Sequence, residues 1–78
     1  MKKIETGALV RLKFKTVRYS QYDLRSEKIE NDEDKPVGIV IEHHRSGQIS
    51  VKWIKGNAEI GHPTGSVGLF WNMKMEVL

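Results

Sequence analysis

Residues 9–15, with the sequence LVRLKFK, alternate between apolar and basic side chains. The apolar positions are Val10, Leu12 and Phe14, and the basic positions are Arg11, Lys13 and Lys15. Successive side chains of a β-strand point to opposite faces, so this period is typical of a strand with one buried and one solvent-exposed face. The stretch predicts a first strand whose apolar row faces a core and whose basic row faces water.

Two later runs predict a hairpin. Residues 38–42 (GIVIE) are rich in β-branched side chains and are entered through Pro36, which is tolerated at the beginning of a strand. Residues 49–53 (ISVKW) alternate again, so that their isoleucine, valine and tryptophan share one face. Between the two runs, residues 45–48 (RSGQ) supply a glycine for a tight turn.

The last part of the chain predicts two more strands with one helical turn between them. Residues 67–71 (VGLFW) are apolar enough for a fourth strand, and residues 75–78 (MEVL) alternate as a fifth. Residues 72–74 have the length of a single 3₁₀ turn. A sustained 3.6-residue apolar stripe is missing from the sequence, so a long helix is not expected.

Residues 16–35 differ in kind from the rest of the chain. Their apolar side chains are scattered among polar ones, and the segment ends in the acidic run of residues 30–34 (ENDED). A connection of this length within a small domain is usually functional or mobile. We expect a long first loop here, and the sequence leaves open whether that loop is ordered.

Size and composition predict one soluble domain over residues 1–78. The chain has 78 residues, of which 38% are hydrophobic and 29% charged, and its formal net charge is +3. It contains no cysteine, and its basic beginning is not followed by the apolar run of an export signal. Its apolar stretches are far shorter than the roughly 20 residues that cross a bilayer. We therefore expect a cytoplasmic protein that does not bind membranes.

The order of these elements resembles an SH3-like small β-barrel of the broad KOW/Tudor-like kind. Residues 7–13 resemble its first strand, residues 37–42 its second, residues 49–53 its third, and residues 71–78 its closing turn and fifth strand. The layout is also similar to short stand-alone barrel proteins encoded by tailed bacteriophages. The resemblance implies an all-β, five-stranded barrel with a long first loop and one 3₁₀ turn before the last strand, in the host cytoplasm if phage-encoded. It does not by itself imply a ligand.

Catalysis, cofactors and metal ions are not predicted. The serines and threonines are isolated from any local nucleophile signature, and the glycines of residues 61–68 do not precede a helix that could cradle phosphate. His43 and His44 are adjacent, so in a strand they point to opposite faces and cannot easily share a metal. The acidic run of residues 30–34 does not fit a calcium loop. No small-molecule substrate is evident either, and the sequence predicts a binding module rather than an enzyme.

The aromatic side chains provide the leading hypothesis for binding. Phe70 and Trp71 are consecutive in a predicted strand, so one faces inward and the other outward, and the pattern does not say with certainty which. An outward Trp71 beside Tyr19 and Tyr22 of the first loop would form a shallow groove for a protein partner or for a second copy of the chain. The competing interpretation is that Trp71 adds to the core or to an oligomer contact.

Nucleic-acid binding is the alternative hypothesis. Arg11, Lys13 and Lys15 on the outward face of the first strand, with Arg18 on the loop after it, could meet phosphates while nearby tyrosines stack on bases. The competing interpretation is a solvated strand face, on which lysine guards against aggregation. The net charge of +3 gives only a modest attraction for polyanions.

Overall fold

The computed structural model describes residues 4–78, and within that range all regular structure is strand or 3₁₀ turn. The strands are β1 (Leu9–Leu12), β2 (Phe14–Ser20), β3 (Asp23–Lys28), β4 (Val37–His43), β5 (Gln48–Lys55), β6 (Val67–Trp71) and β7 (Met75–Val77). The 3₁₀ turns are η1 (Asp32–Asp34), η2 (Ala58–Ile60) and η3 (Asn72–Lys74). The expected all-β class is confirmed, and η3 is the turn predicted before the last strand.

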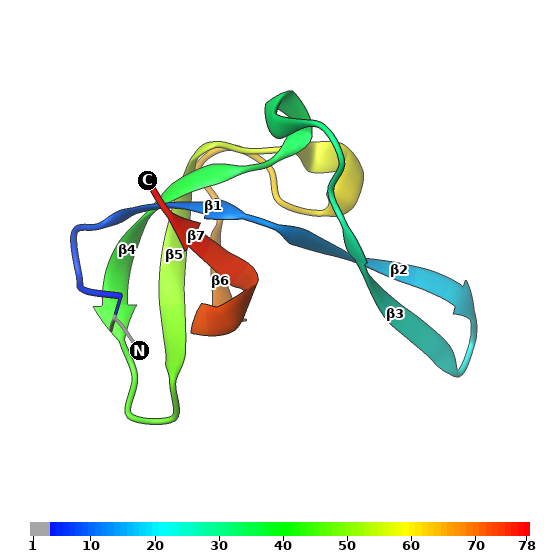
Figure 1. The fold of residues 1–78 in the computed structure, drawn as a ribbon, viewed down its shortest axis with the longest axis horizontal. Coiled ribbons are helices and arrows are strands. Elements are labelled where there is room, and N and C mark those ends of the chain that lie inside the picture. Colours follow the sequence, from blue (N-terminus) through cyan, green and yellow to red (C-terminus); the bar gives the residue numbers. More distant parts are fainter. Residues whose placement is uncertain (1–3) are drawn as a thin grey trace.

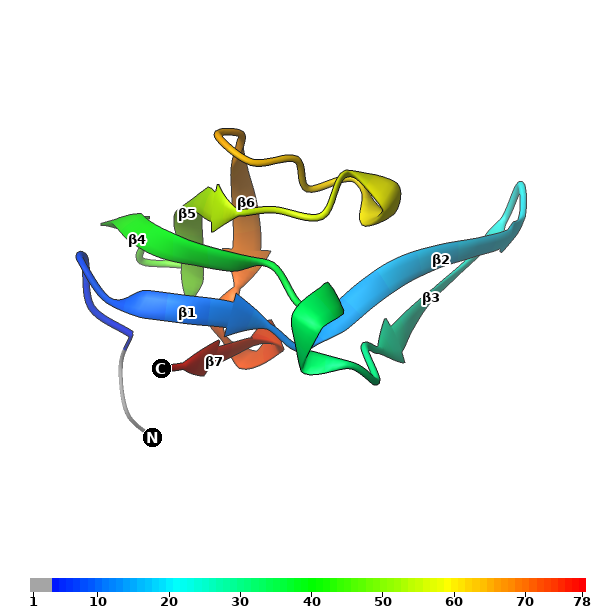
Figure 2. The same ribbon diagram turned by 90° about the horizontal axis from the view of Figure 1, so that it is seen from above.

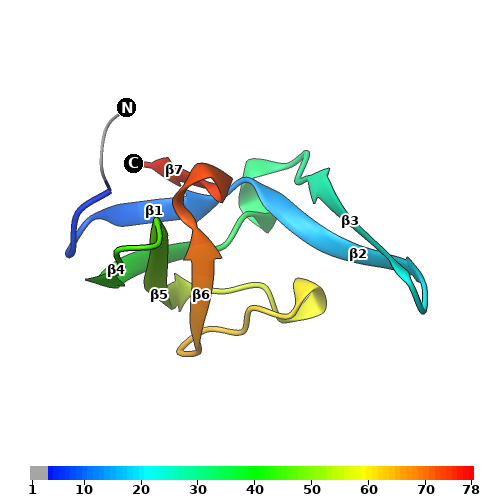
Figure 3. The same cartoon turned by 90° about the horizontal axis from the view of Figure 1, so that it is seen from below.

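Five strands form one antiparallel sheet in the order β6-β5-β4-β1-β7 (Figure 1). The sheet is strongly twisted, so that β6 runs across the direction of β1 (Figure 3). The predicted hairpin of β4 and β5 is present, and its turn contains Gly47 at a φ of 88°, a conformation that glycine adopts without strain. The strands β6 and β7 form the two edges of the sheet.

The core lies on one face of this sheet. It consists of Ile4, Val10, Leu12, Ile29, Val40, Ile49, Val51, Trp53 and Met75. The inward positions predicted for the first and third strands are confirmed at Val10, Leu12 and Trp53, which are at most 1% exposed. Phe14, the third predicted inward residue, is only partly buried.

The first strand is shorter than its alternation predicts. The pattern continues to residue 15, but the sheet strand β1 ends at Leu12, and β2 begins at Phe14 in a separate two-stranded sheet. The break is at Lys13, whose backbone N–H donates to the carbonyl oxygen of Lys74 while its own carbonyl accepts from Ile29. Backbone pairing with two different segments turns the chain away from the sheet at this residue.

The expectation of a long first loop over residues 16–35 is wrong. Most of this segment is the antiparallel hairpin of β2 and β3, in which Thr16 pairs with Ser26 and Val17 with Arg25. The hairpin projects away from the five-stranded sheet in all three views (Figures 1, 2 and 3). Because most side chains on both of its faces are exposed, its sequence lacks the apolar and polar alternation by which a half-buried strand is recognised.

No helix in the described part of the chain is long and apolar enough to cross a membrane.

Candidate partner-binding site

The two aromatic residues at the end of β6 have opposite orientations. Phe70 is partly buried, and its ring meets the rings of Trp53 and His62 with centroid distances of 5.3 and 5.2 Å. Trp71 is 46% exposed on the other face of the strand, with Leu69 at 54% and Val67 at 56%. Phe70 is therefore the inward residue, and Trp71 belongs to an apolar row of three on the outward face of β6.

The backbone groups of these same three residues are free of partners within the sheet. Ser66 accepts a hydrogen bond from the N–H of Trp53 at 2.9 Å, and Asn72 donates to the carbonyl of Gly47 at 3.2 Å. Hydrogen-bonded positions alternate along an antiparallel strand, so residues 66, 68, 70 and 72 face β5. The N–H and C=O groups of Val67, Leu69 and Trp71 consequently point to the open edge of the sheet.

A groove of about 210 Å³ lies beside this edge. Its lining consists of Leu12, Phe14, Thr16, His62, Leu69, Phe70, Trp71 and Lys74, and we call it the β6 groove. Phe14 and Thr16 of β2 line the groove together with Leu69 and Trp71 of β6. The same alternation, counted from the Lys13–Ile29 hydrogen bond, directs the backbone groups of Phe14 and Thr16 away from β3. The groove thus lies between two strands that both have free backbone groups.

The β6 groove has several apolar side chains in its lining and little charge. Lys74 is the one charged residue among the described residues of its lining, and its Nζ donates to Ser26 Oγ at 2.7 Å. Burial between aromatic rings lowers the pKa of His62 below its usual 6.5, so its ring is neutral at pH 7. No carboxylate lines the groove. The site is suited to apolar groups, with one cation at its rim.

The three aromatic residues that the sequence singled out are not all brought together. Tyr19 and Tyr22 lie at the turn of the β2–β3 hairpin, which reaches away from the sheet, whereas Trp71 ends β6 (Figures 1 and 2). Tyr22 is 90% exposed, and the Tyr19 ring carries the Arg25 guanidinium 4.9 Å from its centroid. Only Trp71 lines the groove.

Sequence reasoning missed most of the groove. Phe14, Thr16, Leu69 and Lys74 were not identified as site residues, because their proximity depends on the chain folding back between β2 and β6. One signal was available in residues 67–71 (VGLFW). This strand has an apolar residue at every outward position and no charge, which is unusual for a strand with an exposed face.

The basic residues proposed for nucleic-acid binding do not form a single row. Arg11 is partly buried and donates to both carboxylate oxygens of Glu76 at 3.1 Å, with Asp32 3.7 Å away. Lys35 donates to Asp32 at 2.8 Å. The hydrogen bond from Lys35 and the charge of Arg11 lower the pKa of Asp32. Arg11 therefore belongs to an ion-pair network that joins β1, β7 and η1.

The other proposed basic residues belong to different surroundings. Lys13 marks the break between β1 and β2, and Lys15 lines a second pocket next to the hairpin. Arg18 is exposed on β2. The positive charges available to a polyanion are consequently those of the hairpin rather than those of β1.

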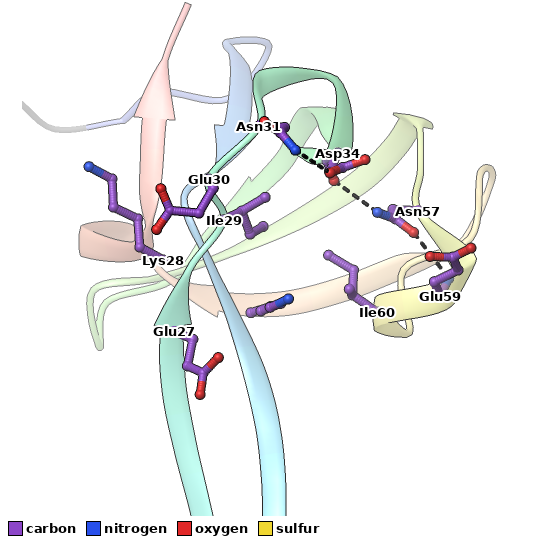
Figure 4. Close-up of a pocket in the computed structure, with 10 residues that line it drawn as sticks. Glu27, Lys28, Ile29, Glu30, Asn31, Asp34, Asn57, Glu59 and Ile60 are labelled. Atoms are coloured by element: carbon purple, nitrogen blue, oxygen red, sulfur yellow. Dashed lines mark hydrogen bonds between the residues drawn. The ribbon is translucent and has the colours of Figure 1, made fainter.

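The second pocket, of about 350 Å³, lies between the base of the hairpin and η2 (Figure 4). Asn57 connects two of its walls: Asn57 Nδ2 donates to the backbone carbonyl of Asp34 at 2.9 Å, and Asn57 Oδ1 accepts from the N–H of Glu59 at 3.1 Å. In the described residues, no group of three histidine or acidic side chains is placed to hold a metal ion. The contacts of Asn57 fix η1 against η2.

One histidine and one serine are in hydrogen-bond contact. His44 Nε2 lies 2.8 Å from Ser50 Oγ, and His44 Nδ1 lies 4.0 Å from Glu42 Oε1, which exceeds a hydrogen bond. A hydrolytic site also needs a cleft for substrate and donors for an oxyanion. Neither pocket described above is lined by any of these three residues. We interpret the contact as a cross-strand hydrogen bond of the β4–β5 hairpin.

Comparison with models of known protein families, with curated proteins and with solved structures found no match to this chain. The function is therefore inferred from the residues and geometry of the chain itself.

Proposed function

We propose that this chain is a non-catalytic interaction module that binds a protein partner or a second copy of itself through the β6 groove. The observation that carries the proposal is that the edge strand β6 lacks features that would prevent another chain from pairing with it. Edge strands usually have lysine, proline, a bulge or a covering segment that prevents pairing with other chains. β6 contains no lysine or proline, its pairing with β5 shows no bulge, and three of its five residues have exposed apolar side chains.

We also propose that the sheet is an SH3-like barrel of the KOW/Tudor-like kind, related to the small barrel proteins of tailed bacteriophages. The order β6-β5-β4-β1-β7, the hairpin inserted after β1 and the 3₁₀ turn before β7 support this assignment. In this reading the β2–β3 hairpin takes the place of the long first loop. Folds of this type serve many ligands, so the site decides the function.

Substitution of Trp71 tests the binding proposal. We expect Trp71→Ser to abolish whichever binding the unmodified chain shows, either concentration-dependent association in sedimentation velocity or retention of specific partners from the native host. Met73→Ser is the matched control, because Met73 is exposed and apolar but does not line the groove. A protein that stays monomeric and retains no partner, or one whose binding is unaffected by Trp71→Ser, would contradict the proposal.

A second candidate function, nucleic-acid binding, is favoured by the shape and charge of the β2–β3 hairpin. The hairpin projects from the sheet (Figure 2). Arg18, Arg25 and two tyrosines lie toward its far end, and the Arg25 guanidinium lies over the Tyr19 ring. A two-stranded ribbon fits the major groove of DNA, and stacked aromatic residues suit single strands.

Titration with single- and double-stranded oligonucleotides at several salt concentrations tests this second function. We expect weak binding that declines as salt rises and that is further weakened by Arg18→Gln. Binding insensitive to salt, or no binding at low salt, would exclude a charge-driven mechanism.

A further inference from the structure

We infer that the β6 groove accepts an extended peptide segment of a partner protein, which pairs with β6 as an additional strand of the sheet. This inference rests on the proposed interaction function and specifies how the partner is held. In such strand addition, main-chain hydrogen bonds provide affinity and side-chain pockets provide selectivity.

The free backbone of β6 provides the hydrogen bonds. The N–H and C=O groups of Val67, Leu69 and Trp71 point away from β5, as the bonds at Ser66 and Asn72 require. They form no backbone hydrogen bond outside the strand pairs of the described residues. These three residues can therefore exchange hydrogen bonds with an incoming strand without breaking any bond of the folded chain.

The shape of the groove favours a single extended segment over a second folded sheet. Besides Leu69 and Trp71 of β6, the groove is lined by Phe14 and Thr16 of β2. A second copy would have to bring its own neighbouring elements into this space along with its β6. A peptide brings only one strand and no neighbouring elements.

The lining defines the chemistry of the peptide. Alternate side chains of an extended peptide share one face, and those on the face of Leu69 and Trp71 must be apolar to pack against them. Lys74 lines the groove, and none of the described lining residues is a carboxylate. Charge complementarity therefore places an acidic residue of the peptide near Lys74. The net charge of +3 adds to the preference for an acidic partner.

Selection from a library of random dodecapeptides tests the chemistry directly. We expect enrichment of sequences with apolar residues at alternate positions and an Asp or Glu toward one end, and depletion of proline within the alternating part. Enrichment of proline-rich or basic peptides would overturn the inference.

Hydrogen exchange of backbone amides, measured by NMR with the best selected peptide, tests the pairing. In the free protein the amides of Val67, Leu69 and Trp71 should exchange faster than those of Gly68 and Phe70. On binding, we expect exchange of the first three to slow at least tenfold. The same peptide with N-methylated backbone amides on the pairing side should bind at least tenfold more weakly, although its side chains are unchanged.

Leu69→Pro removes a pairing N–H from the protein, as N-methylation does from the peptide. Proline removes the N–H that faces the open edge but leaves the ladder to β5 intact, which edge strands tolerate. We expect peptide affinity to fall at least tenfold for Leu69→Pro and to change less than about threefold for Leu69→Val. Circular dichroism and thermal melts establish that both variants are folded. If Leu69→Pro does not fold, the N-methylated peptide decides the question.

The outcomes separate this inference from the proposed function. Peptide binding that protects other amides, or that ignores both Leu69→Pro and N-methylation, would overturn strand addition while leaving an interaction module. A dimer whose β6 amides become protected without peptide would identify a second copy as the occupant and refute the peptide. Absence of peptide binding, dimer and partner would refute both proposals.

Discussion

Trp53 is the largest buried side chain, and it connects β5 to the segments around it. It is 1% exposed, and its ring meets Phe70 and His62 at centroid distances of 5.3 and 5.4 Å. We predict that Trp53→Ala lowers the free energy of unfolding by about 3–5 kcal/mol, enough to unfold most molecules of so small a domain. Urea denaturation measures this change in the free energy of unfolding. Trp71→Ala, at an exposed position, should cost less than about 1 kcal/mol, and equal effects would contradict the core assignment.

Gly38 lies on the inner face of β4, opposite Trp53. A Cβ at this position would lie 2.7 Å from the carbonyl oxygen of Lys52 and 3.0 Å from Trp53 Cε3, and would also collide with Val51 Cγ1. We predict that Gly38→Ala destabilises the protein by about 1–3 kcal/mol through overpacking. Glu42→Ala, on the same strand but exposed, is the control for thermal melts. Equal stability of the two variants would show that β4 and β5 are less tightly packed.

The burial of His62 makes stability depend on pH. Its pKa is lowered by desolvation, so as pH falls the unfolded chain takes up this proton before the folded chain does. The stabilisation from His62 is fully present above its unfolded pKa of about 6.5 and is lost as pH falls from there toward the folded value. We predict that His62→Gln flattens the decline in melting temperature between pH 7.5 and 5.5. An unchanged slope would exclude His62 as its source.

Only the base of the β2–β3 hairpin contributes to the hydrophobic core. Most of its side chains are exposed, and those at its far end are not part of the hydrophobic core. We predict that replacing residues 17–25 with a short Gly-containing turn keeps the five-stranded sheet and changes unfolding free energy by less than about 1 kcal/mol. Chemical denaturation with circular dichroism measures this. Loss of cooperative unfolding would show that the hairpin supports the sheet.

The sequence predicts a strand well where one face of that strand is buried. Alternation predicts β5 and β7, because burial on one side imposes that pattern, whereas β-branched or apolar runs predict β4 and β6. The hairpin was missed because water reaches both of its faces. The end of β1 was missed because alternation continues past Lys13, while the change of hydrogen-bond partner at that residue has no local sequence signal.

The candidate site is likewise predicted only in part by the sequence. The outward orientation of Trp71 was one of the two arrangements expected for consecutive residues in a strand. The sequence does not predict the β6 groove, because its lining combines residues that are distant in sequence, such as Phe14 and Leu69. The grouping of Tyr19, Tyr22 and Trp71 assumed a loop that folds over the sheet, whereas cross-strand pairing holds the two tyrosines on an arm that points away from it.

The whole molecule has an elongated outline because of that arm. Its principal extents are 35, 25 and 20 Å, and the radius of gyration of its Cα atoms is 12.2 Å. We predict that small-angle X-ray scattering at low concentration gives a monomer of these proportions, and that shortening the hairpin reduces its longest dimension. A rounder monomer would show that the arm folds back onto the sheet.

An open, uncharged strand edge also bears on solubility. Short apolar segments without charge or proline can stack into cross-β fibrils once their backbone groups are accessible, and β6 meets these conditions in the folded state. A molecule that occupied the edge would block the template for fibril growth at the same time as it formed a complex. The binding partner would then also protect this protein from amyloid-like aggregation.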